Sequence, residues 1–519
     1  MKTKKWLAML LVGVLATSCL AGCGDSASNG KGQDSKGKKT IEIKYWKAGL
    51  GEQWLTDVIA GFEDKYPEYK IELLSSSGIE LLTSAFGLED TDTTDLYLGI
   101  KKYDKDKLEP LDDVLDATAD GDTKTIREKF SPYYLSMEKA ADGKTYNLTY
   151  GGGLVGIVYN KKMYEEAGIV TVPRTTDELV LACESLVANG DVPFCHFAPV
   201  GYWETFMPDV FFAQYDGLDY VMNNFYACVD EQGNSPSLDV FTKKDGRYKA
   251  LEVLAQLNTP EYVLEGSSTY DYITMQTKWL QGEAAMMVTG SWIEGEMSTI
   301  ATMNDFEMMK TPVVSSITEK LTTVKTDKQL REVISAIDSV TNGDKEESAY
   351  KQGENYAVGD LTVSAEDWNY VKAARNTMCG HFAGNSAYIP NYADQIEGAK
   401  EFLKYLYSDE GYKIYTKATN LVMPLELCEG ELDTDGWSPF ELNQLALYNS
   451  TEQFTSDYLA GKHEIFISGG ATRFGSGTTY VDKFCTKNVA ERMTVAQAWD
   501  DIIAKTKDNY ENVWIKNIE

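Results

Sequence analysis

Ala284-Ala285-Met286-Met287-Val288-Thr289-Gly290-Ser291-Trp292 is the stretch that indicates the fold of this chain. Its first five residues are an unbroken apolar run, which is typical of a strand covered on both faces of a sheet. Thr289-Gly290 predicts a turn, and Ser291 with Glu294 predicts a capping box that opens a helix. We therefore expect Trp292 in the first turn of a helix, beside the carboxyl end of a buried strand.

The position of Trp292 favours a role in ligand binding. In open α/β sheets, small ligands bind at the carboxyl ends of strands. A single buried tryptophan is more often part of the core. The functional interpretation gains support because other aromatic residues recur at similar strand-to-helix turns in the chain.

The segment after residue 40 reads as a βαβ unit. Apolar residues alternate with Glu42 and Lys44 over residues 41–45, which predicts a strand that ends at Trp46-Lys47. A helix follows with one apolar face, and Pro67 ends it at Tyr66. Residues 70–74 and 95–99 are the next two strands. Trp54, on the packed helix face, is expected in the core.

A glycine triplet at Tyr150-Gly151-Gly152-Gly153 precedes the apolar strand 154–159. Three glycines could cradle a phosphate, but no P-loop lysine stands at the required spacing. A bend where the backbone crosses between lobes, close to a ligand, is the better interpretation. Residues 160–168 then form a short helix that ends at a glycine. Thr175 with Glu178 predicts a second capping box, whose helix closes at Asn189-Gly190 before a strand at 192–195.

The N-terminus has the features of a targeting signal. Residues 1–5 include three lysines, and the mostly apolar run 6–18 is too short to span a bilayer comfortably, which indicates a signal peptide over 1–22. Leu20-Ala21-Gly22-Cys23 resembles the lipobox of bacterial lipoproteins, in which the cysteine becomes the lipidated first residue. Residues 24–39 are almost free of apolar side chains and form a flexible tether. We expect a palmitate-type lipid anchor at Cys23 and a protein held at the extracellular face of the membrane.

Charge and cysteine content narrow the class of protein. The chain of 519 residues has 49 basic and 80 acidic residues, and removing a leader with three lysines leaves 497 residues and a net charge of −34. A field of that sign disfavours nucleic acid and anionic lipid. Six cysteines beyond Cys23 are too sparse for a disulfide scaffold. Cys183 is expected as a buried thiol, although a Cys183–Cys195 bridge is left open.

Four blocks carry a resemblance to a known family. The first runs from Gly143-Lys144-Thr145-Tyr146 through Val158 to Lys162, and the second from Glu166 to Leu179. The third is Gly282 to Met287 with Gly290-Ser291-Trp292, and the fourth is Ala399 to Gly411 with Pro424. Together they resemble the extracellular solute-binding proteins of ABC transporters, closest to the carbohydrate-binding group that includes maltose-binding protein. They span nearly the whole mature chain in the expected order.

The resemblance implies an α/β fold with two lobes, a hinge of crossing strands and a ligand in the cleft between the lobes. Lobe 1 is expected over residues 40–148 and 380–422, and lobe 2 over 149–314 and 423–519. Residues 315–379 do not fit the family pattern and are interpreted as an inserted helical segment. Within that segment, Ser364 with Asp367 predicts a helix that carries Trp368.

A cleft with aromatic and polar residues suits a sugar. Tryptophan and tyrosine rings cover the apolar faces of a pyranose, and carboxylates or amides take its hydroxyl groups. The candidates for ligand binding are Trp46, Lys47, Asp95, Tyr150, Gly151, Trp203, Glu204, Trp292, His381 and Asn385. Each of them also has an ordinary structural interpretation, and for Trp499, in an Ala-rich helix, the core is favoured.

Other classes of function are weaker matches. A glycan-active hydrolase needs two carboxylates across a cleft, and no motif locates such a pair. Metal binding is disfavoured because His196, His381 and His463 are isolated, and fragments such as Asp90-Thr91-Asp92 lack the later glutamate of a calcium loop. A ligand-binding protein that feeds a sensor kinase is equally compatible with the sequence.

We therefore expect a monomeric, non-catalytic receptor without a cofactor or a metal, anchored to the membrane by lipid. We expect the receptor to capture a carbohydrate by closure of its two domains. Its protein partners would be ABC permease subunits with an ATPase. Release of reducing ends from a polysaccharide would favour the hydrolase instead.

Overall fold

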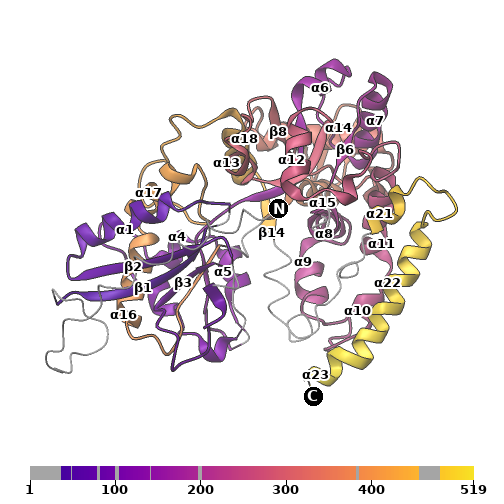
Figure 1. Ribbon diagram of the computed structural model, residues 1–519. Helices are drawn as coiled ribbons and strands as arrows, with labels where there is room; N and C mark the ends of the chain where they lie inside the picture. Colours follow the sequence, from indigo (N-terminus) through magenta and orange to yellow (C-terminus); the bar gives the residue numbers. More distant parts are fainter. Residues whose placement is uncertain are drawn as a thin grey trace, which may run out of the picture.

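The computed structural model describes residues 37–47, 49–78, 82–99, 104–140, 142–196, 202–380, 385–454 and 480–518. The chain forms two lobes, each built around its own β-sheet (Figure 1). Helices α1, α16 and α17 surround the sheet of lobe 1, whereas α6 to α8, α11 and α22 belong to lobe 2. This arrangement confirms the predicted two-lobed α/β class.

The sheet of lobe 1 has five strands in the order β2-β1-β3-β13-β4. Strands β1, β2 and β3 run parallel, and β13 runs antiparallel to both β3 and β4. The bounds are β1 Lys39–Trp46, β2 Tyr69–Ser76, β3 Leu96–Gly99, β4 Leu148–Thr149 and β13 Ser386–Tyr388.

The sheet of lobe 2 has six strands in the order β14-β12-β5-β7-β6, with β8 paired to β5. Strand β5 lies at its centre and runs antiparallel to β7, β8 and β12. The bounds are β5 Leu154–Asn160, β6 Phe194–Cys195, β7 Met286–Gly290, β8 Phe306–Met308, β12 Thr377–Gly380 and β14 Glu452–Phe454.

Helices cover both sheets. Those of lobe 1 are α1 Gln53–Lys65, α3 Asp112–Leu115, α4 Ile126–Lys129, α5 Pro132–Glu138, α16 Ile396–Leu406 and α17 Asp409–Thr419. Those of lobe 2 before the inserted segment are α6 Lys161–Glu166, α7 Thr176–Asn189, α8 Tyr202–Asp216, α9 Leu218–Tyr220, α10 Asp239–Thr242, α11 Asp245–Leu257, α12 Tyr272–Leu280 and α13 Ile293–Met297. The later ones are α18 Pro439–Asn449, α21 Tyr480–Cys485, α22 Val495–Asn509 and α23 Ile515–Ile518.

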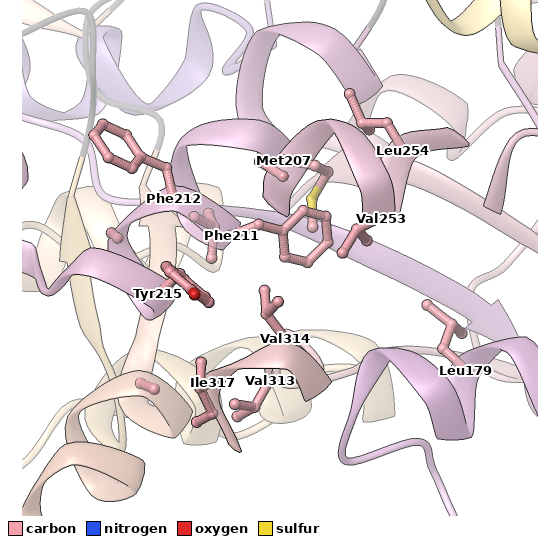
Figure 2. Packing of buried hydrophobic residues seen from close by; sticks show 14 of the residues in the cluster. Leu179, Met207, Phe211, Phe212, Tyr215, Val253, Leu254, Val313, Val314 and Ile317 are labelled. Atoms are coloured by element: carbon pink, nitrogen blue, oxygen red, sulfur yellow. The ribbon is translucent and has the colours of Figure 1, made fainter. Parts of the chain in front are cut away.

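The largest hydrophobic core lies in lobe 2, where α8 is apolar on nearly every side and therefore sits inside the lobe. Figure 2 shows Phe211 of α8 between Val253 of α11 and Val314, which follows β8. The core of lobe 1 is separate and gathers around α1, whose Trp54 and Phe62 are fully buried. Burial of Trp54 and of Trp499 confirms both predictions of core tryptophans.

In the part of the chain that the structure describes, three connections link the two lobes. The chain leaves the sheet of lobe 1 after β4 and enters that of lobe 2 at β5, through residues 150–153. It returns between β12 and β13, and crosses a third time between α17 and α18. Several parallel connections of this kind allow rotation about a hinge while they restrict sliding of the lobes.

The stretch that begins at Ala284 departs from its predicted local structure in two ways. Strand β7 continues through Gly290, so no turn forms at Thr289-Gly290. Ser291 does not cap α13, because its hydroxyl accepts the amide of Leu154 at 2.8 Å and donates to Gln444 Oε1 at 2.8 Å. The predicted capping box is therefore wrong: long-range partners from β5 and α18 outcompete the local one.

The other local signals give a mixed result. Helix α1 ends at Lys65, before Pro67, and α7 ends at Asn189 with Gly190 in the left-handed conformation, as expected. Thr175 accepts the amide of Glu178, but the Glu178 carboxylate pairs with Arg174 instead of closing a capping box. Cys183 and Cys195 are both buried free thiols, so the bridge between them is absent.

The segment 315–379 contains helices α14 Asp327–Thr341 and α15 Ala365–Asn376. It also contains a three-stranded antiparallel sheet that was not predicted, with β9 Lys351–Gln352, β10 Asn355–Val358 and β11 Leu361–Val363. Strands this short show too little alternation to be recognised in a sequence. Trp368 of α15 is buried and stacks on Tyr356, with ring centroids 4.2 Å apart.

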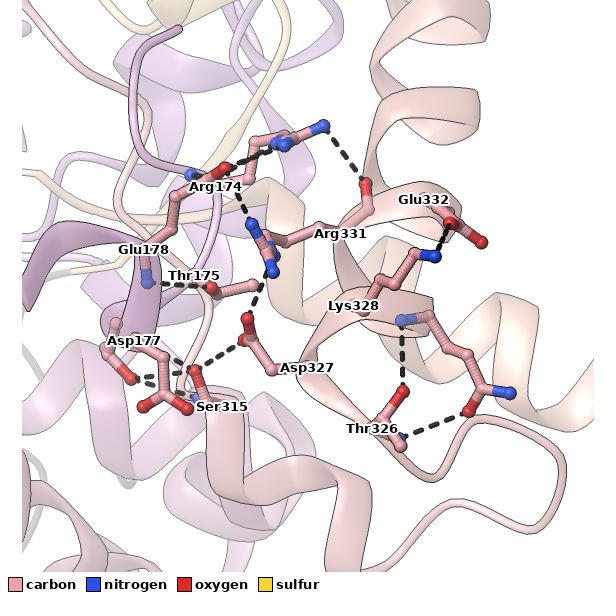
Figure 3. A network of polar contacts seen from close by, with 12 residues as sticks. Arg174, Thr175, Asp177, Glu178, Ser315, Thr326, Asp327, Lys328, Arg331 and Glu332 are labelled. Atoms are coloured by element: carbon pink, nitrogen blue, oxygen red, sulfur yellow. Dashed lines mark hydrogen bonds and ion pairs between the residues drawn. The ribbon is translucent and has the colours of Figure 1, made fainter. Parts of the chain in front are cut away.

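A polar network joins the segment 315–379 to α7 (Figure 3). Arg174 and Arg331 both contact the Glu178 carboxylate, Arg174 at 2.7 Å. Arg331 also pairs with Asp327, which accepts the hydroxyl of Ser315 at 2.9 Å. The segment is thus built into lobe 2 by charged contacts as well as by the shared core.

Candidate ligand-binding site

The strand register brings several predicted residues to one edge of lobe 1, by which we mean the side where the carboxyl ends of β1, β3 and β4 lie. Tyr45 of β1 lies opposite Leu98 of β3, so Trp46 is level with the carboxyl end of β3. On the other side of β3, the antiparallel strand β13 begins at Ser386, which lies opposite both Gly99 and Thr149. At this edge Trp46 is the last residue of a strand, Lys47 and Tyr150 directly follow strands, and Asn385 directly precedes one.

The facing edge of lobe 2 is built in the same way. Gly290, the last residue of β7, lies opposite Val155, and Gly380, the last residue of β12, lies opposite Leu154. The amide of Ser291 donates to Leu154 O at 3.0 Å. Trp292 comes next, so it leaves the sheet where the first crossing segment enters lobe 2.

The two edges touch at Trp292. A Cβ placed on Gly49, in the loop after β1, would lie 3.8 Å from the Cβ of Trp292. A Cβ placed on Gly295 of α13 would lie 3.7 Å from the carbonyl oxygen of Gly49. Trp46 and Trp292 are both partly exposed and do not belong to two separate sealed interiors.

Polar groups surround Trp46 in lobe 1. Its indole nitrogen donates to Ser77 O at 3.1 Å, and Lys47 Nζ lies 3.4 Å from Glu52 Oε2. The hydroxyl of Ser75 donates to the same Glu52 carboxylate and lowers its pKa. The side chains of Lys47 and Glu52 keep 39% and 43% of their surface exposed, so both can reach a ligand.

Sequence reasoning missed Glu52. It directly precedes α1 and makes no side-chain cap there, so its carboxylate serves Lys47 and Ser75 instead of the helix. An acidic residue just before a helix that follows a strand is a signal that could have identified it.

Gly151 and Asn385 lie together at the hinge. A Cβ on Gly151 would come within 2.7 Å of Asn385 Nδ2, so only glycine leaves room for that amide. The hydroxyl of Thr149 donates to the carbonyl oxygens of both residues at 3.2 Å. Two of the crossing segments are thereby joined next to the facing edges.

The ring of Tyr150 belongs to the core of lobe 1. Tyr150 has no exposed surface and stacks on Trp54, with ring centroids 5.4 Å apart. Its backbone amide donates to Asn385 O at 2.8 Å. The side chain therefore supports the hinge from inside and offers no face to a ligand in this structure.

Asp95 lies at the wrong end of its strand for the site. It precedes β3 and is thus at the amino end, opposite the edge that carries Trp46. Its carboxylate accepts the amides of Glu42 at 2.8 Å and Gln395 at 2.7 Å. Because the side chain is buried, its pKa rises to about 6. Asp95 fastens β3 to β1 and to the start of α16, and we leave it out of the site.

Three predicted residues have side chains outside the described part. His381 lies outside the described residues. Trp203 and Glu204 lie in the first turn of α8, which follows β6, and their side chains are likewise not described. Strand β6 runs parallel to β7.

One group among the described residues has the spacing of metal ligands. Atoms of Asp122, Asp409 and Cys428 all lie within 4.8 Å of one another. The buried ammonium of Lys129 lies 2.6 Å from Asp122 Oδ2 and 2.8 Å from Asp409 Oδ1, and the amide of Cys428 also donates to Asp409. Both carboxylates thus already pair with the same lysine, and the group serves the contact between α4, α17 and the third crossing segment.

A pocket of about 940 Å³ lies beside the hinge. It is lined by segments of both lobes, including residues 128–132, 422–427 and 448–449. The predicted ligand-binding residues whose side chains are described do not line it. It follows the third crossing segment and includes Gln453 of β14.

Comparison with known proteins assigns this chain to a family. A family model described as bacterial extracellular solute-binding protein matches residues 44–413. No curated protein matches the sequence. Within the described residues, no helix has both the length and the apolar character needed to cross a membrane.

Solved structures share the fold. AcbH, a bacterial solute receptor described as exclusive for β-D-galactopyranose, has a TM-score of 0.60 at 13% identity over 92% of this chain and 99% of its own. RafE from Streptococcus pneumoniae has a TM-score of 0.59 at 15% identity over 91% and 98%. The GacH receptor of Streptomyces glaucescens has a TM-score of 0.56 at 14% identity over 90% and 98%. Because the family model spans more than half of the 519 residues, this chain belongs to the bacterial extracellular solute-binding proteins.

Proposed function

We propose that the protein is the membrane-anchored receptor of an ABC importer and that it captures a carbohydrate between its lobes. The observation that carries the proposal is the approach of the Gly49 loop, which follows Trp46 and Lys47 in lobe 1, to Trp292 of lobe 2. Similar folds support the choice of ligand, since RafE is known in complex with raffinose and a related binding protein in complex with mannotriose.

The proposed site combines the two kinds of contact that a sugar needs. The indole rings of Trp46 and Trp292 would cover the apolar faces of pyranose units. Lys47, Glu52 and the amide of Asn385 would take hydroxyl groups, and the charged members make the stronger hydrogen bonds. We further assign Trp203, Glu204 and His381 to the site on sequence grounds.

Binding would favour the closed arrangement of the lobes. A ligand held by both Trp46 and Trp292 contacts both lobes only when they approach each other, so its binding free energy shifts the population toward closure. Permease subunits with an ATPase would then recognise the closed form. We expect a lipid on Cys23 to hold the protein at the extracellular face of the membrane.

A thermal-shift screen tests the proposal. We would use raffinose, mannotriose, acarbose and galactose as probes, because a ligand that binds only the folded state raises the melting temperature. At one hundred times Kd, a single site adds about 2.7 kcal/mol, which for a chain of this size raises Tm by about 2 °C or more. We expect one of these probes, or a longer oligosaccharide, to give such a shift.

The matched variants are Trp292→Ala and Tyr350→Ala. Tyr350 is a partly buried aromatic residue of the inserted segment, and its ring packs at a tilt against Trp368, with ring centroids 5.8 Å apart. Trp292→Ala should reduce the shift, because one stacking surface is lost and binding weakens, and Tyr350→Ala should keep it. A shift of parental size in Trp292→Ala removes Trp292 from the site.

We also propose that the receptor is not catalytic. Incubation of the protein with the oligosaccharide that it binds should leave the sugar intact, as measured by reducing-end release. New reducing ends would point to a hydrolase with carboxylates on both sides of the cleft.

A further inference from the structure

Gly290 occupies a position in a buried strand, where glycine lowers the stability of the fold. It is the last residue of β7, a fully buried strand in the middle of the lobe 2 sheet, and it pairs with Val155 of β5. A glycine inside a strand loses backbone entropy on folding and contributes no side chain to packing. Its φ is not in the left-handed range that favours glycine. The backbone therefore does not explain the residue.

The ring of Trp292 explains it. A Cβ on Gly290 would lie 2.0 Å from Cζ3, 2.2 Å from Cη2 and 2.4 Å from Cε3 of Trp292. These three carbons form one edge of the six-membered part of the indole. The ring thus folds back over the strand and occupies the space where any other residue would place its side chain.

We propose that Gly290 is a positioning residue that holds the indole of Trp292 against the backbone of β7 and so fixes the orientation in which it meets a ligand. The contact sets one side of the ring against a rigid strand, and Trp292 also packs against the core of lobe 2. The Cβ of Trp292 meets the Gly49 loop of lobe 1. The ring is thus held by lobe 2, while Trp292 as a whole stays partly exposed.

The benefit of this arrangement is preorganisation. A stacking ring that is already fixed loses little rotamer freedom when a sugar binds, so more of the contact energy appears as affinity. The statement about ring orientation depends only on the structure, whereas its effect on affinity rests on the proposed function. The experiment therefore has one measurement without a ligand and one with a ligand.

The measurement without a ligand uses protein labelled with 5-fluorotryptophan and ¹⁹F NMR. The resonance of Trp292 is identified by its loss in Trp292→Ala. Gly290→Ala should move or broaden that resonance and leave the other resonances in place, because the methyl group forces the ring into another rotamer. An unchanged Trp292 resonance in Gly290→Ala would overturn the proposal.

Gly156→Ala is the matched control. Gly156 lies in the adjacent strand β5, opposite Thr289, and a Cβ there would lie 3.1 Å from Sδ of Met308. That side chain is flexible and can move aside. Gly156→Ala should leave the Trp292 resonance where it is in the parent protein. Equal changes in both variants would show a general disturbance of the sheet and would also contradict the positioning role.

The measurement with a ligand is a double-mutant cycle by calorimetry, with whichever of raffinose, mannotriose, acarbose or galactose binds. Gly290→Ala should weaken binding about tenfold, the equivalent of one well-oriented stacking contact. In the Trp292→Ala background the same change should have no further effect. A Gly290 effect that persists without Trp292 overturns the proposal. Binding that is unaffected by Trp292→Ala contradicts the proposed ligand site but leaves the NMR result standing.

Discussion

Two aspartates of lobe 1 show that surroundings decide what a carboxylate does. Burial alone would raise the pKa of Asp92, but the hydroxyls of Thr94, Tyr392 and Tyr97 donate to it and the net effect is a lowered pKa. Asp95 is also buried, yet it accepts only two backbone amides, and its pKa rises to about 6. A sequence shows both simply as acids beside a strand, which is why Asp95 was assigned to the site.

The raised pKa of Asp95 predicts a stability change with pH. An acid whose pKa is higher in the folded state binds its proton more tightly there, so its stabilising effect is present below the unfolded pKa of about 3.9 and is lost as pH rises through 6. The loss amounts to about 2–3 kcal/mol in the free energy of unfolding. Asp95→Asn should flatten the decrease between pH 4 and 6.5, measured by urea unfolding.

Asp92→Asn provides the control of opposite sign. The pKa of Asp92 is lowered, so its stabilising effect is present above the unfolded pKa and is lost only as pH falls through the folded value, below about 4. Asp92→Asn should lower stability without changing the slope between pH 4 and 6.5. If Asp95→Asn and Asp92→Asn change that slope equally, burial of Asp95 is not the cause.

At the scale of elements, the accuracy of the sequence predictions depends on where the deciding partner lies. Pro67 and Gly190 end their helices through backbone restrictions that no distant residue can override, and both ends were predicted correctly. The hydroxyl of Ser291 is under no such restriction, and it forms hydrogen bonds with Leu154 and Gln444 instead of capping α13. Cap predictions fail where tertiary partners compete for a side chain.

The first turn of α15 binds the backbone of residues 322–324, and this contact provides a prediction about stability. Asp367 accepts the backbone amides of Thr322 at 2.9 Å and Val324 at 3.2 Å, and that of Thr323 between them. Burial opposes the charge, but these bonds and the Thr323 hydroxyl lower the pKa of Asp367. Asp367→Asn places an NH₂ group against donors and should cost about 2 kcal/mol of stability, measured by urea unfolding at pH 7.

Asp360→Asn is the comparison for that change. Asp360 is an exposed acid in the turn between β10 and β11, in the same segment of the chain. Its substitution should change stability by less than about 0.5 kcal/mol. Similar losses in both variants would mean that charge, and not the amide contacts of Asp367, stabilises the segment.

For the whole molecule, the two-lobed fold was predictable because it rests on the order of four blocks and on alternating strands and helices. The site was predictable only in part. Trp46 and Trp292 follow strands at the facing edges, so strand-end reasoning finds them. Tyr150 also follows a strand, but its ring turns into the core onto Trp54, and a sequence does not show to which side a ring turns.

The proposed lipid anchor at Cys23 predicts where the protein is found in cells. Residues 37 and 38 lead directly into β1, whose amino end is the end of lobe 1 away from Trp46. With a lipid on Cys23, the protein should sediment with membranes, and Cys23→Ser should release it into the medium or leave it as unprocessed precursor. Fractionation with immunoblotting measures this, and Cys428→Ser is a control that should remain with the membrane. Membrane association of Cys23→Ser equal to that of the parent protein would contradict the anchor.

The contact between the lobes predicts a covalent link that reports their relative position. A Cβ on Gly49 would lie 3.8 Å from that of Trp292, which matches the mean Cβ separation in disulfides. Under mild oxidation, Gly49→Cys with Trp292→Cys should form a disulfide that joins lobe 1 to lobe 2, seen as a reversible mobility change on a non-reducing gel. Each single variant is the control, and four of the other described cysteines are buried, so oxidant reaches them poorly. The left-handed φ of Gly49 costs about 1–2 kcal/mol when cysteine replaces it, and this lowers stability without preventing the link. Absence of the link would show that the lobes do not rest against each other at Trp292, and the proposed closure around that residue would lose its starting point.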